Sequence, residues 1–173
     1  KNPPVRPVID VEESFEDSEP VAKETVPPST QELWLLKLLL KHESALDWLV
    51  SHLNPEWIVH PVVRSVVSRR LVIHQQGGWQ SLGLFLDGIE SAEARGWVTE
   101  AAAEERAIPN PEQQFADLVL RLRNQFLDRQ LAALTQKLSQ PEVGEEEKLE
   151  WLRQQQQLRQ SKRQPLSPLP PAP

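Results

Sequence analysis

The longest helical pattern of the chain begins at Asn110, and no glycine or proline interrupts it between Pro111 and Pro141. Asn110 suits the position that caps a helix, and Pro111 suits the first helical position. Apolar residues recur at spacings of three and four, as on one face of an α-helix: Phe115, Leu118, Val119, Leu122, Phe126, Leu127, Leu131, Leu134 and Leu138. At a rise of 1.5 Å per residue, such a helix is roughly 42 Å long. Part of it is therefore expected to project beyond a small domain.

A second helical pattern follows after a short connection that contains Pro141 and Gly144. Three consecutive glutamates at 145–147 place negative charge at the positive end of this helix. A thin apolar stripe then runs to about residue 160 among glutamines: Leu149, Leu152 and Leu158. Because short connections join antiparallel neighbours, residues 111–160 are predicted to form a long helical hairpin.

Within this hairpin, the sequence suggests which side chains face inward and which face outward. The following leucines are expected to close the two helices on each other: Leu134, Leu138, Leu149 and Leu152. Trp151 and Leu158 are then expected on the surface, with Trp151 as a half-exposed aromatic anchor for a partner protein.

Residues 29–110 predict a compact helical body. Ser29 and Glu32 form a capping box that opens a leucine-rich helix of about twelve residues, which is expected to be the central core helix. Further helices are predicted from about Ser44 to Asn54, from Pro61 to Gly77, from Leu82 to Ile89 and from Ser91 to Glu105. The segment after Pro61 is rich in valine, which favours strands, but its three-four spacing favours a helix. The predicted fold class is all-α: a compact six-helix subdomain followed by a long C-terminal antiparallel helical hairpin.

Proline-rich segments flank these helices. Residues 1–28 contain six prolines and seven acidic residues, which predicts a disordered acidic linker and suggests that another domain precedes it. A short apolar run at 8–11 could instead dock as a strand. Residues 161–173 contain five prolines and predict a flexible tail, with a polyproline ligand as the alternative. Neither flank is expected to contribute much to folding.

The amino-acid composition excludes or disfavours several classes of function for this chain. The 173-residue chain has no cysteine, which excludes disulfides and thiolate metal sites. Its four histidines lie on separate predicted elements, so neither a metal nor another cofactor is expected. The net charge of −6 disfavours direct nucleic-acid binding. No apolar run is long enough for a membrane span and no signal peptide opens the chain, so a cytoplasmic location is expected. No catalytic constellation or small-molecule site is recognisable in the sequence.

Three stretches carry a family resemblance: ELWLLKLLLKHESALDWL, FADLVLRLRNQFLDRQLAALTQKL and EEEKLEWLRQQQQLRQ. In this order they resemble the C-terminal helicase-binding domain of bacterial replicative primases of the DnaG type, over about residues 31–160. The resemblance implies a non-catalytic domain of a larger primase, whose hairpin docks on the N-terminal domain of the hexameric DnaB-type helicase. By position, the leucines that match the family pattern are Leu131, Leu134, Leu138, Leu149, Leu152 and Leu158.

Two features depart from the family pattern, and two other interpretations stay open. Lys41 and His42 stand where the family usually turns at a proline, and the proline-rich tail runs past the usual end. The body also resembles the N-terminal domain of the replicative helicase itself, which shares the helical fold. Alternatively, the chain is a self-associating oligomerisation domain whose hairpin pairs with its own copy.

Overall fold

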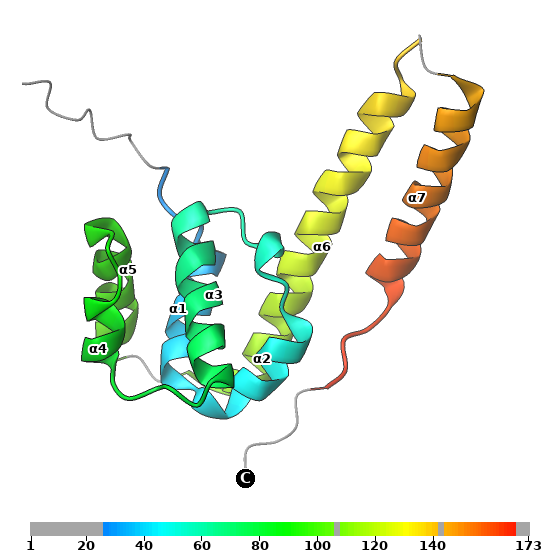
Figure 1. Cartoon of the computed structure of the whole chain (residues 1–173). Helices are drawn as coiled ribbons and strands as arrows, with labels where there is room; N and C mark the ends of the chain where they lie inside the picture. The colour runs from blue at the N-terminus through cyan, green and yellow to red at the C-terminus, as the bar shows by residue number, and fades with distance from the viewer. Residues whose placement is uncertain (1–25, 106–107, 142–143, 169–173) are drawn as a thin grey trace, which may run out of the picture.

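The computed structural model describes residues 26–105, 108–141 and 144–168, and within them every regular element is a helix. In chain order these are α1 (Thr30–Lys41), η1 (Glu43–Ala45), α2 (Leu46–His52), η2 (Pro55–Trp57), α3 (Pro61–Gln75), α4 (Leu82–Asp87), α5 (Ala92–Ala103), α6 (Pro111–Leu138) and α7 (Glu145–Arg163). In Figure 1, α1 to α5 and the lower half of α6 form the body, with α4 and α5 on the side away from α6, and the upper half of α6 projects beside α7. The predicted all-α class is confirmed. Most of the predicted linker and the end of the predicted tail lie outside the described residues.

The helix α1 begins at the predicted capping box. The Ser29 hydroxyl accepts a hydrogen bond from the Glu32 backbone N–H at 3.3 Å, and the Glu32 carboxylate accepts one from the Ser29 N–H at 2.9 Å. The second carboxylate oxygen of Glu32 accepts hydrogen bonds from the backbone N–H groups of Val59 and His60, at 2.9 and 2.8 Å. One buried carboxylate thus caps α1 and also fixes the start of α3.

This network sets the ionisation of Glu32. Burial alone would raise the pKa of the carboxyl group, but the hydrogen bonds from His60, Ser29 and Val59 stabilise the charged form and lower the pKa below its ordinary value of 4.5. A lowered pKa stabilises the fold at pH values above the ordinary one. That contribution is lost as the pH falls through the pKa of the folded state.

We predict that Glu32→Gln destabilises the chain by about 1–3 kcal/mol at neutral pH, because an amide oxygen cannot serve all the donors that the carboxylate now serves. The difference from the parent should shrink as the pH falls below 4.5, since protonation removes the advantage of the parent carboxylate. Urea denaturation of both chains at neutral and acidic pH measures this. A constant difference across that range would contradict the assigned role of Glu32.

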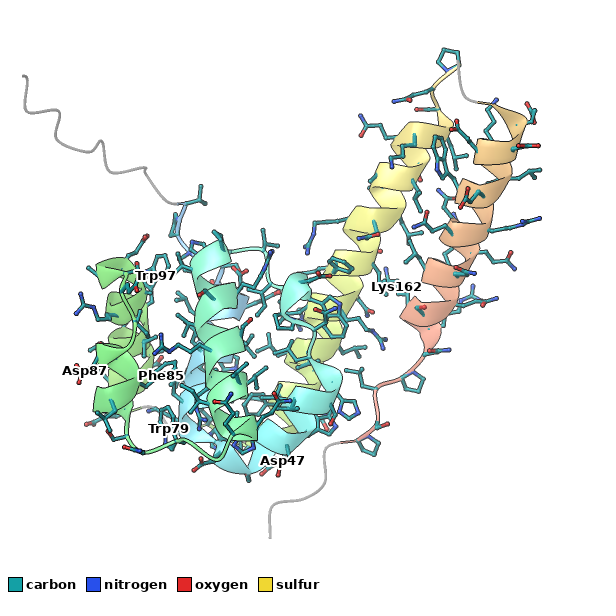
Figure 2. All side chains as sticks on the ribbon, in the orientation of Figure 1. Asp47, Trp79, Phe85, Asp87, Trp97 and Lys162 are labelled. Atoms are coloured by element: carbon teal, nitrogen blue, oxygen red, sulfur yellow. The ribbon has the colours of Figure 1, made fainter. Side chains whose placement is uncertain are left out.

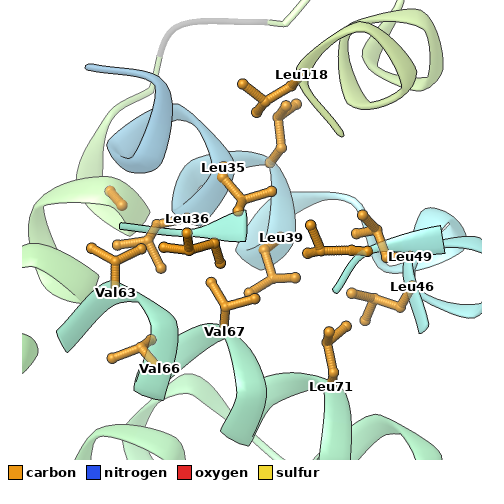
Figure 3. Packing of buried hydrophobic residues seen from close by; sticks show 14 of the residues in the cluster. Leu35, Leu36, Leu39, Leu46, Leu49, Val63, Val66, Val67, Leu71 and Leu118 are labelled. Atoms are coloured by element: carbon orange, nitrogen blue, oxygen red, sulfur yellow. The ribbon is translucent and has the colours of Figure 1, made fainter. Parts of the chain in front are cut away.

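The helix α1 forms the centre of the body. Four of its leucines are at most 1% exposed: Leu35, Leu36, Leu38 and Leu39. They share one core with apolar side chains from the other helices of the body and from the lower half of α6, including Leu46, Leu49, Phe85, Val98, Phe115, Leu118 and Val119. Figure 3 shows Leu36 and Leu39 facing Val63 and Val67 of α3. The prediction that this helix is the core helix is confirmed.

The valine-rich segment is a helix, as its spacing predicted. Pro61 occupies the first turn of α3, and the His60 side chain accepts a hydrogen bond from the Val63 N–H. Three valines on one face are buried: Val63, Val66 and Val67. The helix ends before Gly77, whose φ of +64° lies in the left-handed region that glycine adopts easily. Periodicity therefore prevailed over strand propensity because the valines face a single core.

The start of α6 differs in one detail from the prediction. Pro111 is its first residue, as predicted, but Asn110 makes no side-chain capping bond. Its backbone is left-handed, with φ 47° and ψ 60°, a conformation that asparagine tolerates better than most residues. Asn110 therefore serves the turn into α6 rather than capping its N–H groups.

Two buried cations join elements of the body. The Lys37 ammonium of α1 lies 2.7 Å from a carboxylate oxygen of Glu104 and 4.6 Å from the centre of the Trp34 ring. The Arg70 guanidinium of α3 lies 3.7 Å from the centre of the Trp79 ring. These contacts tie α1 to the end of α5, and α3 to the segment before α4. Both cations thus serve the packing of the body.

Candidate functional site

The hairpin has its own packed seam, separate from the core of the body. On α6, Leu127 and Leu134 are 7% and 5% exposed, while Leu131 and Leu138 are half-buried. These four leucines follow each other at spacings of four, three and four residues, so they line one face of α6. Leu127 and Leu134 are not members of the body's core cluster. The upper half of α6 is therefore buried mainly by α7.

The facing side of α7 is identified by its contacts. Gln155 is 7% exposed, and its side-chain N–H donates to the Thr135 hydroxyl of α6 at 3.0 Å. At the base of the hairpin, the Lys162 ammonium donates to both carboxylate oxygens of Asp128, at 2.6 and 2.8 Å. Figure 2 labels Lys162 at the lower end of α7. The seam of α7 thus follows one three-four stripe: Lys148, Trp151, Gln155, Leu158 and Lys162.

Trp151 lies on this inner stripe, which corrects its predicted place on the surface. Its ring is half-buried, and the Lys137 ammonium of α6 lies 5.7 Å from the ring centre. Leu158, also predicted at the surface, is half-buried on the same stripe. Both side chains lie on the side of α7 that faces α6.

The predicted positions of Leu149 and Leu152 are also corrected, from the inside of the hairpin to its surface. They were predicted to close the hairpin, but they are 55% and 50% exposed. On a helix they lie away from the stripe of Trp151 and Gln155, so they form an outward apolar pair near the distal end of α7. We call Leu149, Leu152 and the exposed side chains beside them the outer face of α7.

Charge on the outer face changes along the helix. The first turns hold the exposed glutamates Glu145, Glu146 and Glu150, whereas the later turns hold the exposed arginines Arg153, Arg159 and Arg163. The two exposed leucines lie where the acidic part passes into the basic part. A partner of this face near the tip must offer apolar contacts together with basic groups.

The segment after α7 returns to the body, which corrects part of the predicted free tail. The helix continues to Arg163, beyond the predicted end near residue 160. The Trp48 indole N–H of α2 donates to the Ser167 carbonyl oxygen at 3.0 Å, and Arg123 donates to the Gln164 carbonyl oxygen at 2.6 Å. Leu166 is half-buried against the core. Residues 164–168, here called the C-terminal strap, therefore tie the base of the hairpin to the body.

We predict that a chain ending at Arg163 is less stable than the parent by about 1–2 kcal/mol, because it loses two hydrogen bonds and the burial of Leu166. Trp48→Phe, which removes the indole donor and keeps an aromatic ring, should cost a smaller part of this. Thermal unfolding followed by circular dichroism measures both. Identical melting of the parent and the shortened chain would show that the strap adds nothing to stability.

One cavity of the body lies beside the start of α1. It is a groove of about 800 Å³ between the segment before α1, the loop that leads into α3, and Leu122 and Gln125 of α6. Two of its polar side chains already serve the fold, since Glu32 caps α1 and the His60 ring nitrogens lie at hydrogen-bond distance from Val26 and Val63. The same described residues contain no cluster of three or more His, Asp or Glu side chains placed to bind a metal.

The described helices were also compared with the requirements for a membrane-spanning helix. Across residues 26–105, 108–141 and 144–168, none combines the length and the apolar character that crossing a bilayer requires. The two longest helices are α6 and α7, and both are rich in charged and amide side chains.

Comparisons of the chain with protein-family models, with curated proteins and with solved structures find no match.

Proposed function

We propose that this chain is the helicase-binding domain of a bacterial replicative primase of the DnaG type. In this role it recruits primase to the hexameric DnaB-type helicase at the replication fork, in the bacterial cytoplasm, and carries no catalytic activity itself. Primer synthesis belongs to another part of the parent protein. The observation that carries the proposal is a projecting hairpin with two half-exposed leucines on its outer face.

The shape of the molecule supports this role. The order of a leucine-rich core helix, a compact helical body and a long hairpin agrees with what the resemblance over residues 31–160 implies. The body buries its apolar residues in one core, while the hairpin extends away from it on its own seam. A projecting element of this kind can enter a groove between helices of a partner without disturbing the body.

The outer face of α7 supplies the chemistry of recognition. Leu149 and Leu152 each keep about half of their surface for a partner, and Glu145 and Glu146 lie one turn before Leu149. Exposed leucines bordered by charged side chains are typical of protein interaction sites. The fitting surface on the helicase is an apolar groove bordered by lysine or arginine. Trp151 and Leu158 contribute indirectly, by holding α7 against α6.

Titration of a bacterial DnaB-type hexamer with the chain tests the function directly. Calorimetry should show saturable binding that is independent of nucleic acid and weakens as salt is added, because glutamates take part. A matched chain ending at Gln140, which lacks α7 and the strap, should show no binding. The absence of saturable binding for the full chain to helicases from several bacterial groups would refute the proposal.

A further inference from the structure

The outer face of α7 carries one stripe of exposed residues with two leucines near the tip of the hairpin. Six exposed residues follow each other at spacings of four, three, four, three and four, and so lie on one line along the helix: Glu145, Leu149, Leu152, Gln156, Arg159 and Arg163. The stripe begins acidic, is apolar at its two leucines and ends basic. An antiparallel copy can place its two leucines against the same two leucines of the first copy.

Two further exposed side chains flank this stripe on the same side. Glu146 and Arg153 are seven residues apart, so both lie on the same flank of the stripe. Along the helix, Glu146 comes before the two leucines and Arg153 comes after them. In a helix pair related by a two-fold axis normal to the plane of the pair, the same flank of both helices meets. Glu146 of one copy can then face Arg153 of the other, twice in each pair.

We infer that the outer face of α7 binds a second copy of this chain, antiparallel, through a two-fold axis that passes between Glu150 and Trp151. In this register Leu149 of each copy packs on Leu152 of the other. Glu146 pairs with Arg153 of the second copy on both sides of the axis, and Glu145 lies level with Gln156. The inner stripe of α7 remains against α6, so pairing leaves each hairpin closed.

The interface is small, since it joins four half-exposed leucines and two exposed ion pairs. It falls below the roughly 1,000 Å² that stable complexes bury, so the pair is weak and reversible. If the proposed function holds, pairing also covers the leucines offered to the helicase. Self-pairing and helicase docking then exclude each other, and the pair keeps the docking face covered until the helicase displaces it.

Charge reversal tests both the pairing and its register. Glu146→Arg sets arginine against Arg153 twice, and Arg153→Glu sets glutamate against Glu146 twice. Each single variant should dissociate roughly tenfold more readily than the parent in sedimentation equilibrium at low ionic strength. The double variant Glu146→Arg/Arg153→Glu restores both pairs and should return to the parent dissociation constant. An equimolar mixture of the two single variants should form a mixed pair.

Glu100→Lys, at an exposed position of α5 in the body, is the matched control and should leave the dissociation constant unchanged. The inference is overturned if the parent chain stays monomeric throughout the accessible concentrations, or if the single and double variants sediment alike. Neither result bears on the helicase, because the experiment contains none. Conversely, a chain that pairs as described but does not bind helicase overturns the proposed function alone.

Discussion

Replacing Leu39 with alanine is expected to lower the free energy of unfolding by roughly 2–5 kcal/mol. The side chain is fully buried at the centre of α1, where it packs on α3 and on the other helices of the body. Alanine removes its burial and leaves a cavity that these helices cannot close without moving. Because the stability of a whole domain is only about 5–15 kcal/mol, the substitution removes a large part of it.

Urea denaturation followed by circular dichroism measures this loss. Leu84→Ala is the matched control, since Leu84 is 56% exposed on α4 and should change stability by about 0.5 kcal/mol or less. A Leu39→Ala chain that unfolds like the parent would show that α1 is not the core of the body.

A chain of residues 26–125 is expected to fold and to lose all detectable helicase binding. The core of the body takes Phe115, Leu118, Val119 and Leu122 from α6, and this chain keeps all four. It lacks the strap, so it should melt somewhat below the parent, but still in one cooperative step. It also lacks the whole projecting hairpin, which holds the proposed docking face.

Calorimetric titration of the helicase and thermal unfolding of the same preparation measure the two effects together. Binding that survives in residues 26–125 would move the docking site onto the body. A chain that is unfolded would show that the hairpin and the strap are required for the core.

Local signals in the sequence were sufficient for most of the fold. Ser29 and Glu32 predicted the start of α1. Pro61 predicted the start of α3, and Gly77 predicted its end. Each of these residues acts through its own backbone geometry or through its near neighbours. The three-four spacing of α3 outweighed its valine content for a similar reason, since one buried stripe is what the core requires.

Local signals in the sequence could not predict which face of α7 packs against α6. Its sequence contains two three-four stripes, one through Leu149 and Leu152 and one through Trp151 and Leu158, and each holds two apolar residues, so counting apolar residues does not separate them. The structure uses the second, because the side chain of Gln155 is satisfied by Thr135 on the other helix. No pattern within α7 contains that contact, so the predicted inner and outer residues were exchanged.

The C-terminal strap was missed for a related reason. Its proline content is typical of a free tail, and the groups that hold it, Trp48 and Arg123, lie far away in the sequence. Glu32 likewise gave a capping signal but no sign that it also binds the backbone before α3. Contacts between distant segments follow from the fold and cannot be counted from local spacing.

The measurement that tests the central claim most directly is titration of the helicase hexamer with a Leu149→Ser/Leu152→Ser chain. Each leucine has about half of its surface left to bury, worth about 1 kcal/mol, so binding should weaken roughly thirtyfold in total. The melting temperature should stay unchanged, because both side chains already face solvent. Leu84→Ser, an exposed leucine on the body, is the control and should bind like the parent. Parent-like affinity of the double variant would contradict docking through the outer face of α7.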